Sequence, residues 1–345
     1  MTTLATATLE RTQPSFRAFG VTVGAVRRLG PSFVRVTFTG ADLDFFGSGG
    51  LDQRIKVVFP DSAGRAPVRS DFDGDSWYQA WRDLPEDVRH PFRTYTIRAT
   101  RSAHETSSGS AEVDVDFVLH GTEPGPDGAP THSGPASRWV ASVVPGAEAV
   151  LIGPNALYAG QPGGIEWQPP VTATTLLLAG DETAAPAITS IIATLPPGTR
   201  AHAFIEVPES GDALTVPVPD GVTLTWLPRH DAVAGVRHDH GVLLDAAVRE
   251  RMSEHCAELA SAATAARQTV RAAEPEDVDI DTDILWDVPA GHAEPGLPAL
   301  SGCYAWIAGE AAVIRDLRRH LVRDLGIDRR SVAFMGYWRR GKAEC

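Results

Sequence analysis

The segment from His90 to Arg98, His-Pro-Phe-Arg-Thr-Tyr-Thr-Ile-Arg, contains the side chains with the clearest chemical potential. A flavin requires a flat apolar surface for its ring, hydrogen-bond donors along its polar edge and positive charge for its phosphates. Side chains two positions apart on a strand share a face, so Arg93 and Tyr95 would place a guanidinium and an aromatic ring side by side. This Arg-x-Tyr-Thr pattern can supply all three requirements, although an ordinary barrel strand explains so short a pattern equally well.

A second pattern, Gly134-Pro-Ala-Ser-Arg-Trp139, follows the pair His120-Gly121. A glycine that opens a helix leaves backbone N–H groups uncovered at the positive end of the helix dipole, which favours a bound diphosphate. The candidate residues for such a turn are Gly134, Pro135, Ala136 and Ser137. The motif is weak alone and gains weight from its position after the Arg-x-Tyr-Thr segment.

The elements around these motifs read as β-strands in the first part of the chain. Short runs rich in Val and Phe predict six strands, at 21–26, 33–39, 55–59, 94–99, 113–119 and 150–152. In the fifth run Asp114 and Asp116 alternate with apolar residues, which places both carboxylates on one face of the strand. We therefore expect a tail at 1–16, a six-stranded antiparallel barrel at 17–159, and a linker rich in Gly and Pro at 160–170.

Beyond the linker, continuous apolar strands alternate with helices. Strands are expected at 174–179, 202–207, 222–226, 304–308 and 331–337. Apolar spacings of three and four predict a helix around Ile188–Leu195 and another over Val313–Leu325, with Gly326 as its cap. This alternation implies right-handed crossovers and a Rossmann-like parallel sheet at 171–345.

The segment 251–300 does not follow this alternation. An Ala-rich helix is expected at 257–273, and the stretch from Glu274 to Asp287 carries seven acids and no base. We interpret the segment as an acidic insertion exposed to water and anchored by Ile284, Leu285 and Trp286. A calcium site is disfavoured because the EF-hand pattern is missing.

The charge distribution limits the partners of the chain. A net charge of −13 argues against nucleic acid. Residues 313–345 nevertheless carry nine bases against four acids, so a basic face could attract an anionic ligand. A helix with a solvated charged face explains the same residues equally well.

The cysteines and the hydropathy pattern point to a reduced compartment. Cys256, Cys303 and Cys345 are too few and too far apart for an iron–sulfur cluster or a structural zinc site. Neither a membrane-spanning run nor a signal peptide is evident, so we expect a cytoplasmic protein, with a monomer as the default.

Six motifs occur along the chain in a specific order. They are Arg93-Thr-Tyr-Thr-Ile-Arg98, His120-Gly121, Gly134-Pro-Ala-Ser-Arg-Trp139, Ala179-Gly-Asp-Glu-Thr-Ala-Ala-Pro-Ala-Ile188, Trp306-Ile-Ala-Gly-Glu-Ala311 and Gly336-Tyr-Trp-Arg-Arg-Gly-Lys342. In this order they resemble the siderophore-interacting protein family of FAD-dependent ferric-siderophore reductases, within the ferredoxin–NADP reductase superfamily. The resemblance runs from about residue 19 to residue 344, apart from the insertion. It implies FAD as cofactor, NADH or NADPH as hydride donor, and release of iron from ferric siderophores by reduction.

The resemblance also assigns roles to residues of the flavin site. It implies that Arg93, Tyr95 and Thr96 hold the flavin ring and the ribityl-phosphate region. Arg98 and His120 would lie close by. The turn at 134–137 would bind the diphosphate.

The chain departs from the superfamily at the nicotinamide loop. Where a Gly-Thr-Gly-type turn is usual, this sequence has Asp181-Glu-Thr-Ala-Ala-Pro186, which includes the candidates Thr183 and Ala184. Two carboxylates would repel a diphosphate, so we expect Asp181 and Glu182 to turn away and cap the following helix. Weak dinucleotide affinity is the resulting prediction.

The last motifs leave alternatives open. Glu310 would orient substrate or nicotinamide, or would cap the last helix. Tyr337 and Trp338 would cover the flavin or pack between domains. The basic residues expected at the mouth of the site, for an anionic iron chelate, are Arg339, Arg340 and Lys342.

Two further groups of polar residues are ambiguous. Arg229 could meet a 2′-phosphate and Glu206 a ribose diol, so the sequence does not choose between NADPH and NADH. The histidines at 230, 238, 240 and 255 lack a closed ligand pattern, and we interpret them as part of a polar loop and not as a metal site.

The sequence thus predicts a reductase in which the protein positions flavin, nicotinamide and iron chelate without a general base. Two alternatives belong to other classes. One is a flavin reductase that passes electrons to a protein such as an oxygenase, and the other is a siderophore-binding protein without catalysis.

Overall fold

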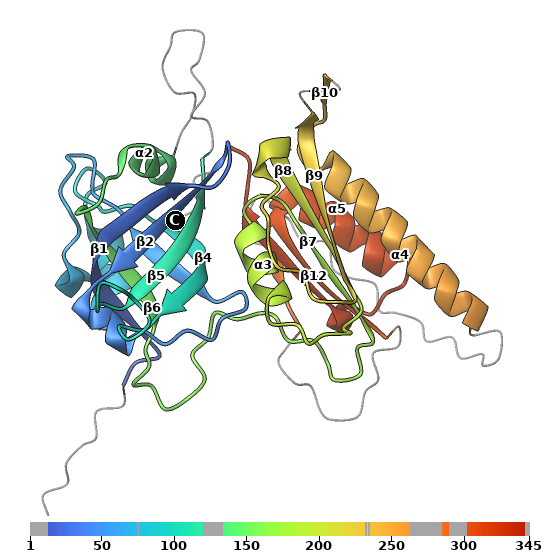
Figure 1. Ribbon diagram of the computed structural model, residues 1–345, viewed down its shortest axis with the longest axis horizontal. Helices are drawn as coiled ribbons and strands as arrows, with labels where there is room; N and C mark the ends of the chain where they lie inside the picture. Colours follow the sequence, from blue (N-terminus) through green and yellow to red (C-terminus); the bar gives the residue numbers. More distant parts are fainter. Residues whose placement is uncertain are drawn as a thin grey trace, which may run out of the picture.

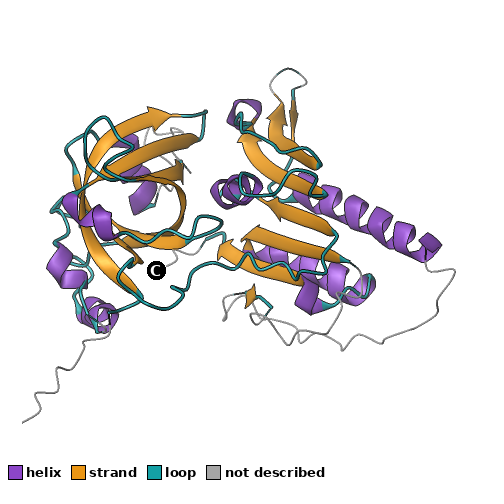
Figure 2. Cartoon of the chain, turned by 60° about the horizontal axis from the view of Figure 1, so that its bottom comes forward, coloured by secondary structure: helices purple, strands orange, loops and turns teal. Residues whose placement is uncertain are grey.

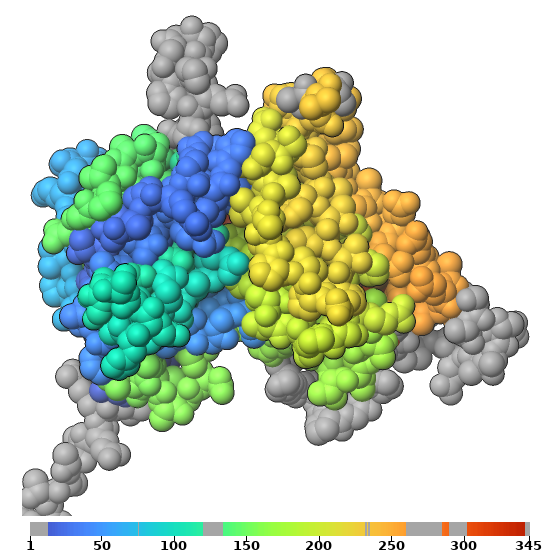
Figure 3. Space-filling view, viewed as in Figure 1, coloured from blue at the N-terminus to red at the C-terminus, as the bar shows by residue number. Residues whose placement is uncertain are grey.

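The computed structural model describes residues 13–74, 76–119, 134–231, 233, 235–262, 285–289 and 302–341. Within these ranges the chain forms an N-terminal barrel beside a C-terminal sheet that is covered by helices on both faces (Figure 1). The two bodies meet along a continuous surface (Figure 3). Ser32 of the barrel marks this contact, since its backbone N–H donates to Asp212 Oδ1 of the second domain at 2.7 Å.

Six antiparallel strands close the barrel in the order β1-β2-β5-β4-β3-β6. They are β1 (Phe16–Arg28), β2 (Phe33–Thr39), β3 (Arg54–Val58), β4 (Phe92–Arg101), β5 (Glu112–Val118) and β6 (Glu148–Pro154). The predicted six-stranded barrel is confirmed.

The alternation predicted for β5 is also confirmed. Its apolar residues line the barrel interior, and Asp114 and Asp116 lie on the opposite face. Each carboxylate accepts two hydrogen bonds from one arginine: Asp116 from Arg35 at 2.6 and 2.8 Å, and Asp114 from Arg101 at 2.8 Å each. These charged pairs explain how acidic residues tolerate burial on a barrel wall.

The barrel closes through only part of β4 among the described strands. Its first half, Phe92 to Thr96, pairs with β3, whereas its pairing with β5 begins only at Ile97. A bulge between Ile97 and Ala99 turns the strand at this point. Among the described strands, the first half of β4 therefore has a neighbour on one side only.

Short helices cover the barrel. The helix α1 (Trp77–Asp83) follows the 3-10 turn Arg69–Phe72 on the outer face. The helix α2 (Pro135–Ser142) packs its Trp139 ring parallel to that of Phe38, with a centroid distance of 6.3 Å and an angle of 6°.

The C-terminal sheet has the strand order β10-β9-β8-β7-β12-β13-β11. Its parallel strands are β7 (Thr175–Gly180), β8 (Ala201–Glu209), β9 (Val222–Asp231), β12 (Cys303–Glu310) and β13 (Val332–Trp338). The short strands β10 (Val236–Arg237) and β11 (Trp286–Asp287) add antiparallel edges. The predicted Rossmann-like sheet is confirmed.

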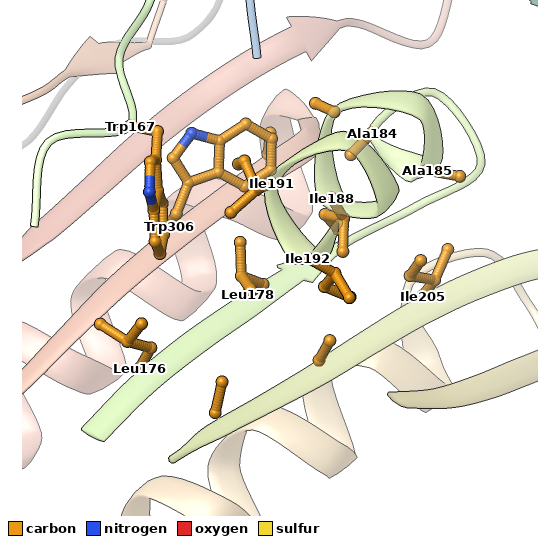
Figure 4. Close-up of a cluster of buried hydrophobic side chains, with 14 of the residues drawn as sticks. Trp167, Leu176, Leu178, Ala184, Ala185, Ile188, Ile191, Ile192, Ile205 and Trp306 are labelled. Atoms are coloured by element: carbon orange, nitrogen blue, oxygen red, sulfur yellow. The ribbon is translucent and has the colours of Figure 1, made fainter. Parts of the chain in front are cut away.

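Helices cover both faces of this sheet (Figures 1 and 2). The helix α3 (Ala185–Ile192) lies on the face toward the barrel, and α4 (Val242–Ala262) and α5 (Ala311–Arg318) lie on the other. Every residue of α3 is buried. Its isoleucines pack against Leu178 and Trp306 of the sheet (Figure 4). None of the helices in the described ranges is long and apolar enough to cross a membrane.

The helix expected at 257–273 begins earlier in the chain than predicted. The helix α4 begins at Val242, and Leu244, Val248 and Met252 are fully buried against the sheet. The fully buried residues are spaced by four and form a narrow stripe, whereas other apolar residues, such as Val242 and Leu243, lie outside it, so the sequence shows no clear helical periodicity. The residues from 251 to about 256 therefore belong to the domain and not to an insertion.

The proposed anchor of the insertion is confirmed for the part that the structure describes. Leu285 is 1% exposed and its carbonyl accepts the N–H of Gly336 at 2.7 Å. Trp286 lies in β11, which pairs with β13. Ile284 and the acidic residues before it lie outside the described residues.

Candidate functional site

A buried carboxylate joins the barrel to the second domain. Asp52, which is completely buried, accepts hydrogen bonds from the backbone N–H groups of Trp167 and Glu166 at 3.1 and 3.0 Å and from Trp306 Nε1 at 3.0 Å. Burial raises the pKa of the Asp52 carboxyl, and the three donors counteract this shift. The contact fixes the barrel, the linker and β12 relative to one another.

An aromatic stack lies beside this carboxylate. The rings of Tyr337 and Trp286 are nearly parallel, 5.9 Å apart at an angle of 13°, and the Arg54 guanidinium lies 4.3 Å from the centre of the Trp286 ring. The hydroxyl of Tyr337 is buried and has no hydrogen-bond partner among the described residues. Burial raises the pKa of Tyr337 well above its ordinary value. An orphaned hydroxyl at a domain boundary suits a ligand with polar edges.

Arg93 and Tyr95 share one face of β4, as predicted. They pair with Val57 and Ile55, whose side chains line the barrel interior. The half-buried Tyr95 ring packs against Phe117 at 4.4 Å, and burial raises the pKa of its hydroxyl. The Arg93 side chain donates to a backbone carbonyl and has no carboxylate partner among the described residues.

The opposite face of β4 carries a different set. Thr96 is buried and pairs with Arg54. Arg98 lies at the bulge, with Nε 4.0 Å from Asp116, and burial lowers the pKa of its guanidinium. Lys56 also lies on this face, 4.9 Å from the centre of the Phe92 ring, and burial lowers its pKa as well. Lys56 was not among the residues predicted from the sequence, although its position between Ile55 and Val57 indicates the polar face of a strand.

The Gly134 turn opens α2 as expected. Gly134 is the N-cap, no side chain caps the helix, and a Cβ added there would meet no atom of the described residues within 4 Å. Pro135 occupies the first helical position, where its missing N–H is harmless. Ser137 is buried in the first turn, next to Ala136. His120 lies outside the described residues.

These features fit an FAD. The half-paired β4, the helix start at Gly134, which no side chain caps, and the orphaned Tyr337 hydroxyl can receive a ring system and a diphosphate. Phe117 packs against both Tyr95 and Trp139, with centroid distances of 4.4 and 6.1 Å, so β4 and α2 share one aromatic cluster.

The turn after β7 differs from the expectation. Asp181 is fully buried, and its carboxylate accepts from Thr183 N at 2.9 Å, Glu310 N at 2.9 Å and Trp338 Nε1 at 2.8 Å. Burial opposes its ionisation, but His240 at 3.4 Å and the hydrogen bonds outweigh this, so the pKa of Asp181 is lowered. The N-cap of α3 is Ala184 without a side-chain bond, so the predicted capping by carboxylates is wrong.

The neighbouring carboxylate, Glu182, is held by an arginine. Arg229 donates to it through both terminal nitrogens, at 2.7 and 3.1 Å, and lies 3.3 Å from Glu206. Glu206 also accepts from the N–H groups of Gly241 and Leu244 at the start of α4, at 2.7 and 2.9 Å. The two residues considered for ribose recognition therefore bind each other.

The last two motifs contribute one helix cap and two partly or fully exposed arginines. Glu310 is the N-cap of α5, accepting from the N–H groups of Ala312 and Val313 at 2.9 and 3.2 Å, so the capping role is the one observed. Its other oxygen accepts Arg340 N at 3.2 Å. Arg339 is half-buried and Arg340 exposed, and Lys342 lies outside the described residues.

The histidines are distributed over separate places. His230 contacts Glu209 at 2.8 Å, His240 contacts Asp181, and His255 is buried in α4. Within the described ranges no three His, Cys, Asp or Glu side chains are arranged to hold a metal ion.

Comparison with known proteins gives a consistent result. A family model described as the siderophore-interacting FAD-binding domain matches residues 22–158, and one described as siderophore-interacting protein matches residues 173–341. An uncharacterized protein of Mycobacterium tuberculosis is 31% identical over 93% of this chain and 90% of its own length.

Two further relatives carry descriptive names. The ferric vibriobactin reductase ViuB of Vibrio cholerae is 30% identical over 57% of this chain and 62% of that protein. The solved structure of the siderophore-interacting protein SipS from Aeromonas hydrophila is 26% identical and superposes with a TM-score of 0.56, covering 96% of this chain and 95% of that one.

Proposed function

Because the chain belongs to the siderophore-interacting protein family, we propose that it is an FAD-dependent reductase that takes hydride from NADH or NADPH and reduces ferric siderophores. Reduction to Fe(II) weakens the hold of hard oxygen ligands and releases the iron, which we assign to the cytoplasm. The relative named ferric vibriobactin reductase supports this substrate class.

The observation that carries the proposal is the half-paired β4 with Arg93, Tyr95 and Thr96 along it. FAD, when bound, accepts two electrons as hydride and releases them singly, as a one-electron acceptor such as Fe(III) requires. Tyr95 would offer an apolar surface to the ring, and Thr96, whose side chain lies on the opposite face of β4, would contribute through its backbone at the half-paired edge. Arg93 is a cation without a carboxylate partner among the described residues, and it would neutralise phosphate charge.

The remaining candidates act by position and charge. The N–H groups of the Gly134 turn would bind the diphosphate. Arg339, Arg340 and Lys342 would attract an anionic chelate to the end of β13 by charge alone. No general base is required, because the protein's task is to keep donor, ring and chelate in reach of one another.

The test is an anaerobic titration of the purified protein. We expect a yellow protein whose flavin absorbance bleaches with NADH or NADPH and recovers with a ferric siderophore, while a chromogenic Fe(II) chelator reports the product. A colourless protein that cannot be loaded with FAD refutes the proposal. Flavin reduction without Fe(II) favours a flavin reductase that serves a protein partner.

A further inference from the structure

The C-terminal sheet has a topological switch point between β7 and β12. From β7 the chain adds β8 and β9 on one side, and it later adds β12 and β13 on the other. In sheets of this class a ligand enters the crevice at this point, beyond the carboxyl ends of the strands. Here the Asp181 side chain lies against Gly309 in the crevice: a Cβ on Gly309 would lie 2.7 Å from Asp181 Oδ2, so the glycine is what accommodates the carboxylate.

The turn after β7 has no exposed donor for a diphosphate. The N–H of Thr183 donates to the Asp181 side chain at 2.9 Å, and that of Ala184 to the Asp181 carbonyl at 3.0 Å. Pro186 has no N–H, and the other three residues of the turn, Glu182, Ala185 and Ala187, are 1%, 1% and 0% exposed. Diphosphate binding at a helix start requires uncovered N–H groups, which the first turn of α3 does not provide.

The charge of the crevice excludes phosphate as well. The buried carboxylates are those of Asp181, Glu182 and Glu206, and the facing cations are Arg229 and His240. Even with His240 protonated, the group carries an excess of one negative charge. Arg229, which is the only arginine that the structure shows within this group, is already neutralised by Glu182 and Glu206.

We propose that the hydride donor is recognised through its dihydronicotinamide ring, and that its adenosine diphosphate half makes no specific contact at the sheet. This inference rests on the proposed function. Loss of hydride converts a neutral dihydronicotinamide into a pyridinium cation, which a negatively charged crevice stabilises. The Trp338 indole, held by Asp181 and in edge contact with His240 at 5.2 Å, offers that ring an aromatic surface.

The first test compares donors of different length by stopped-flow reduction of the flavin in the holoprotein. The donors are NADH, NADPH and reduced nicotinamide mononucleotide. We expect the three values of kcat/KM to agree within about fivefold, because the adenosine half adds no binding at the transition state. A preference of about a hundredfold or more for NADH or NADPH over the mononucleotide overturns the proposal.

The second test is independent of hydride transfer. Calorimetric titration of the holoprotein with ADP-ribose and with 2′,5′-ADP is expected to show no binding up to about 1 mM. A Kd below about 10 μM for either compound overturns the proposal. If no dihydronicotinamide reduces the flavin, the proposed function is wrong about the hydride donor. The titration would still decide whether the crevice binds an adenosine diphosphate.

A charge variant tests whether the buried carboxylates are what excludes phosphate from the crevice. Glu182→Gln should release Arg229 from its bidentate pair and raise the ratio of kcat/KM for NADPH over NADH by about tenfold. The matched control is Asp245→Asn, which removes the same charge from a half-buried pair with Arg249 on α4. A ratio that does not change in Glu182→Gln contradicts the exclusion of phosphate by charge. If this variant does not fold, the donor comparison with the unmodified holoprotein decides.

Discussion

The pair of His240 and Asp181 predicts a specific dependence of stability on pH. The imidazole Nε2 lies 3.4 Å from Asp181 Oδ2 and 4.0 Å from Glu182 Oε2, and its side chain is 9% exposed. Burial and the charge of Arg229 disfavour the imidazolium, but Asp181 and Glu182 outweigh them, so the pKa of His240 is raised above its ordinary 6.5. Its stabilising contribution is therefore complete below that value and is lost as the pH rises through the folded-state pKa.

The distance sets the size of the effect. Two unit charges 3.4 Å apart attract by about 5 kcal/mol at an effective dielectric constant of about 20. Desolvation of the imidazolium cancels part of this attraction, so we expect a net contribution of about 1–3 kcal/mol at low pH. The His240→Gln variant should therefore lose about that much free energy of unfolding near pH 6 and much less near pH 9.

The measurement is urea unfolding of the holoprotein and of His240→Gln across this pH range, together with the NMR titration of the His240 ring proton. The control is His230→Gln, because His230 contacts Glu209 at a more exposed position, with 27% of its side chain accessible, and should show a smaller difference. A difference between wild type and His240→Gln that stays constant with pH, or that grows as the pH rises, would refute the reasoning.

Three further predictions concern the cofactor site and the core. Tyr95→Ala should weaken FAD binding about tenfold or more by removing an aromatic surface, measured by fluorescence titration, whereas Tyr78→Ala, on the outer face of the barrel, should not. Gly134→Asp should weaken FAD binding by about a hundredfold, because it places a carboxylate at the start of α2, and equal affinity would contradict the diphosphate assignment. Met252→Ala should cost about 2–5 kcal/mol in urea unfolding, and Leu259→Ala, 36% exposed on the same helix, under about 1 kcal/mol.

The architecture followed from local patterns. The alternation of Asp114 and Asp116 with apolar neighbours determines which side of β5 faces the core, and continuous apolar runs such as 175–180 determine the parallel sheet. Both patterns are local in sequence, so periodicity is sufficient to read them.

The polar contacts of the site could not be read in the same way. Asp52 accepts a hydrogen bond from Trp306, which is 254 residues away, and Asp181 accepts one from Trp338, 157 residues away. The sequence shows that two carboxylates follow β7 and would repel phosphate. It does not show which hydrogen-bond donors, distant in sequence, bind these carboxylates. That choice depends on tertiary packing, which no local pattern encodes.

The half-paired edge of β4 has a consequence for the newly synthesised chain before it binds a cofactor. Among the described strands, the half-strand Phe92–Thr96 is paired on one side only, and unpaired backbone groups of a strand edge can recruit a strand from another molecule. Bound flavin would shield that edge, so we expect the newly made chain to aggregate less when the cofactor is supplied. We expect expression in flavin-poor cells to give aggregates, and hydrogen exchange to show the amides of this half-strand as the ones that FAD protects most.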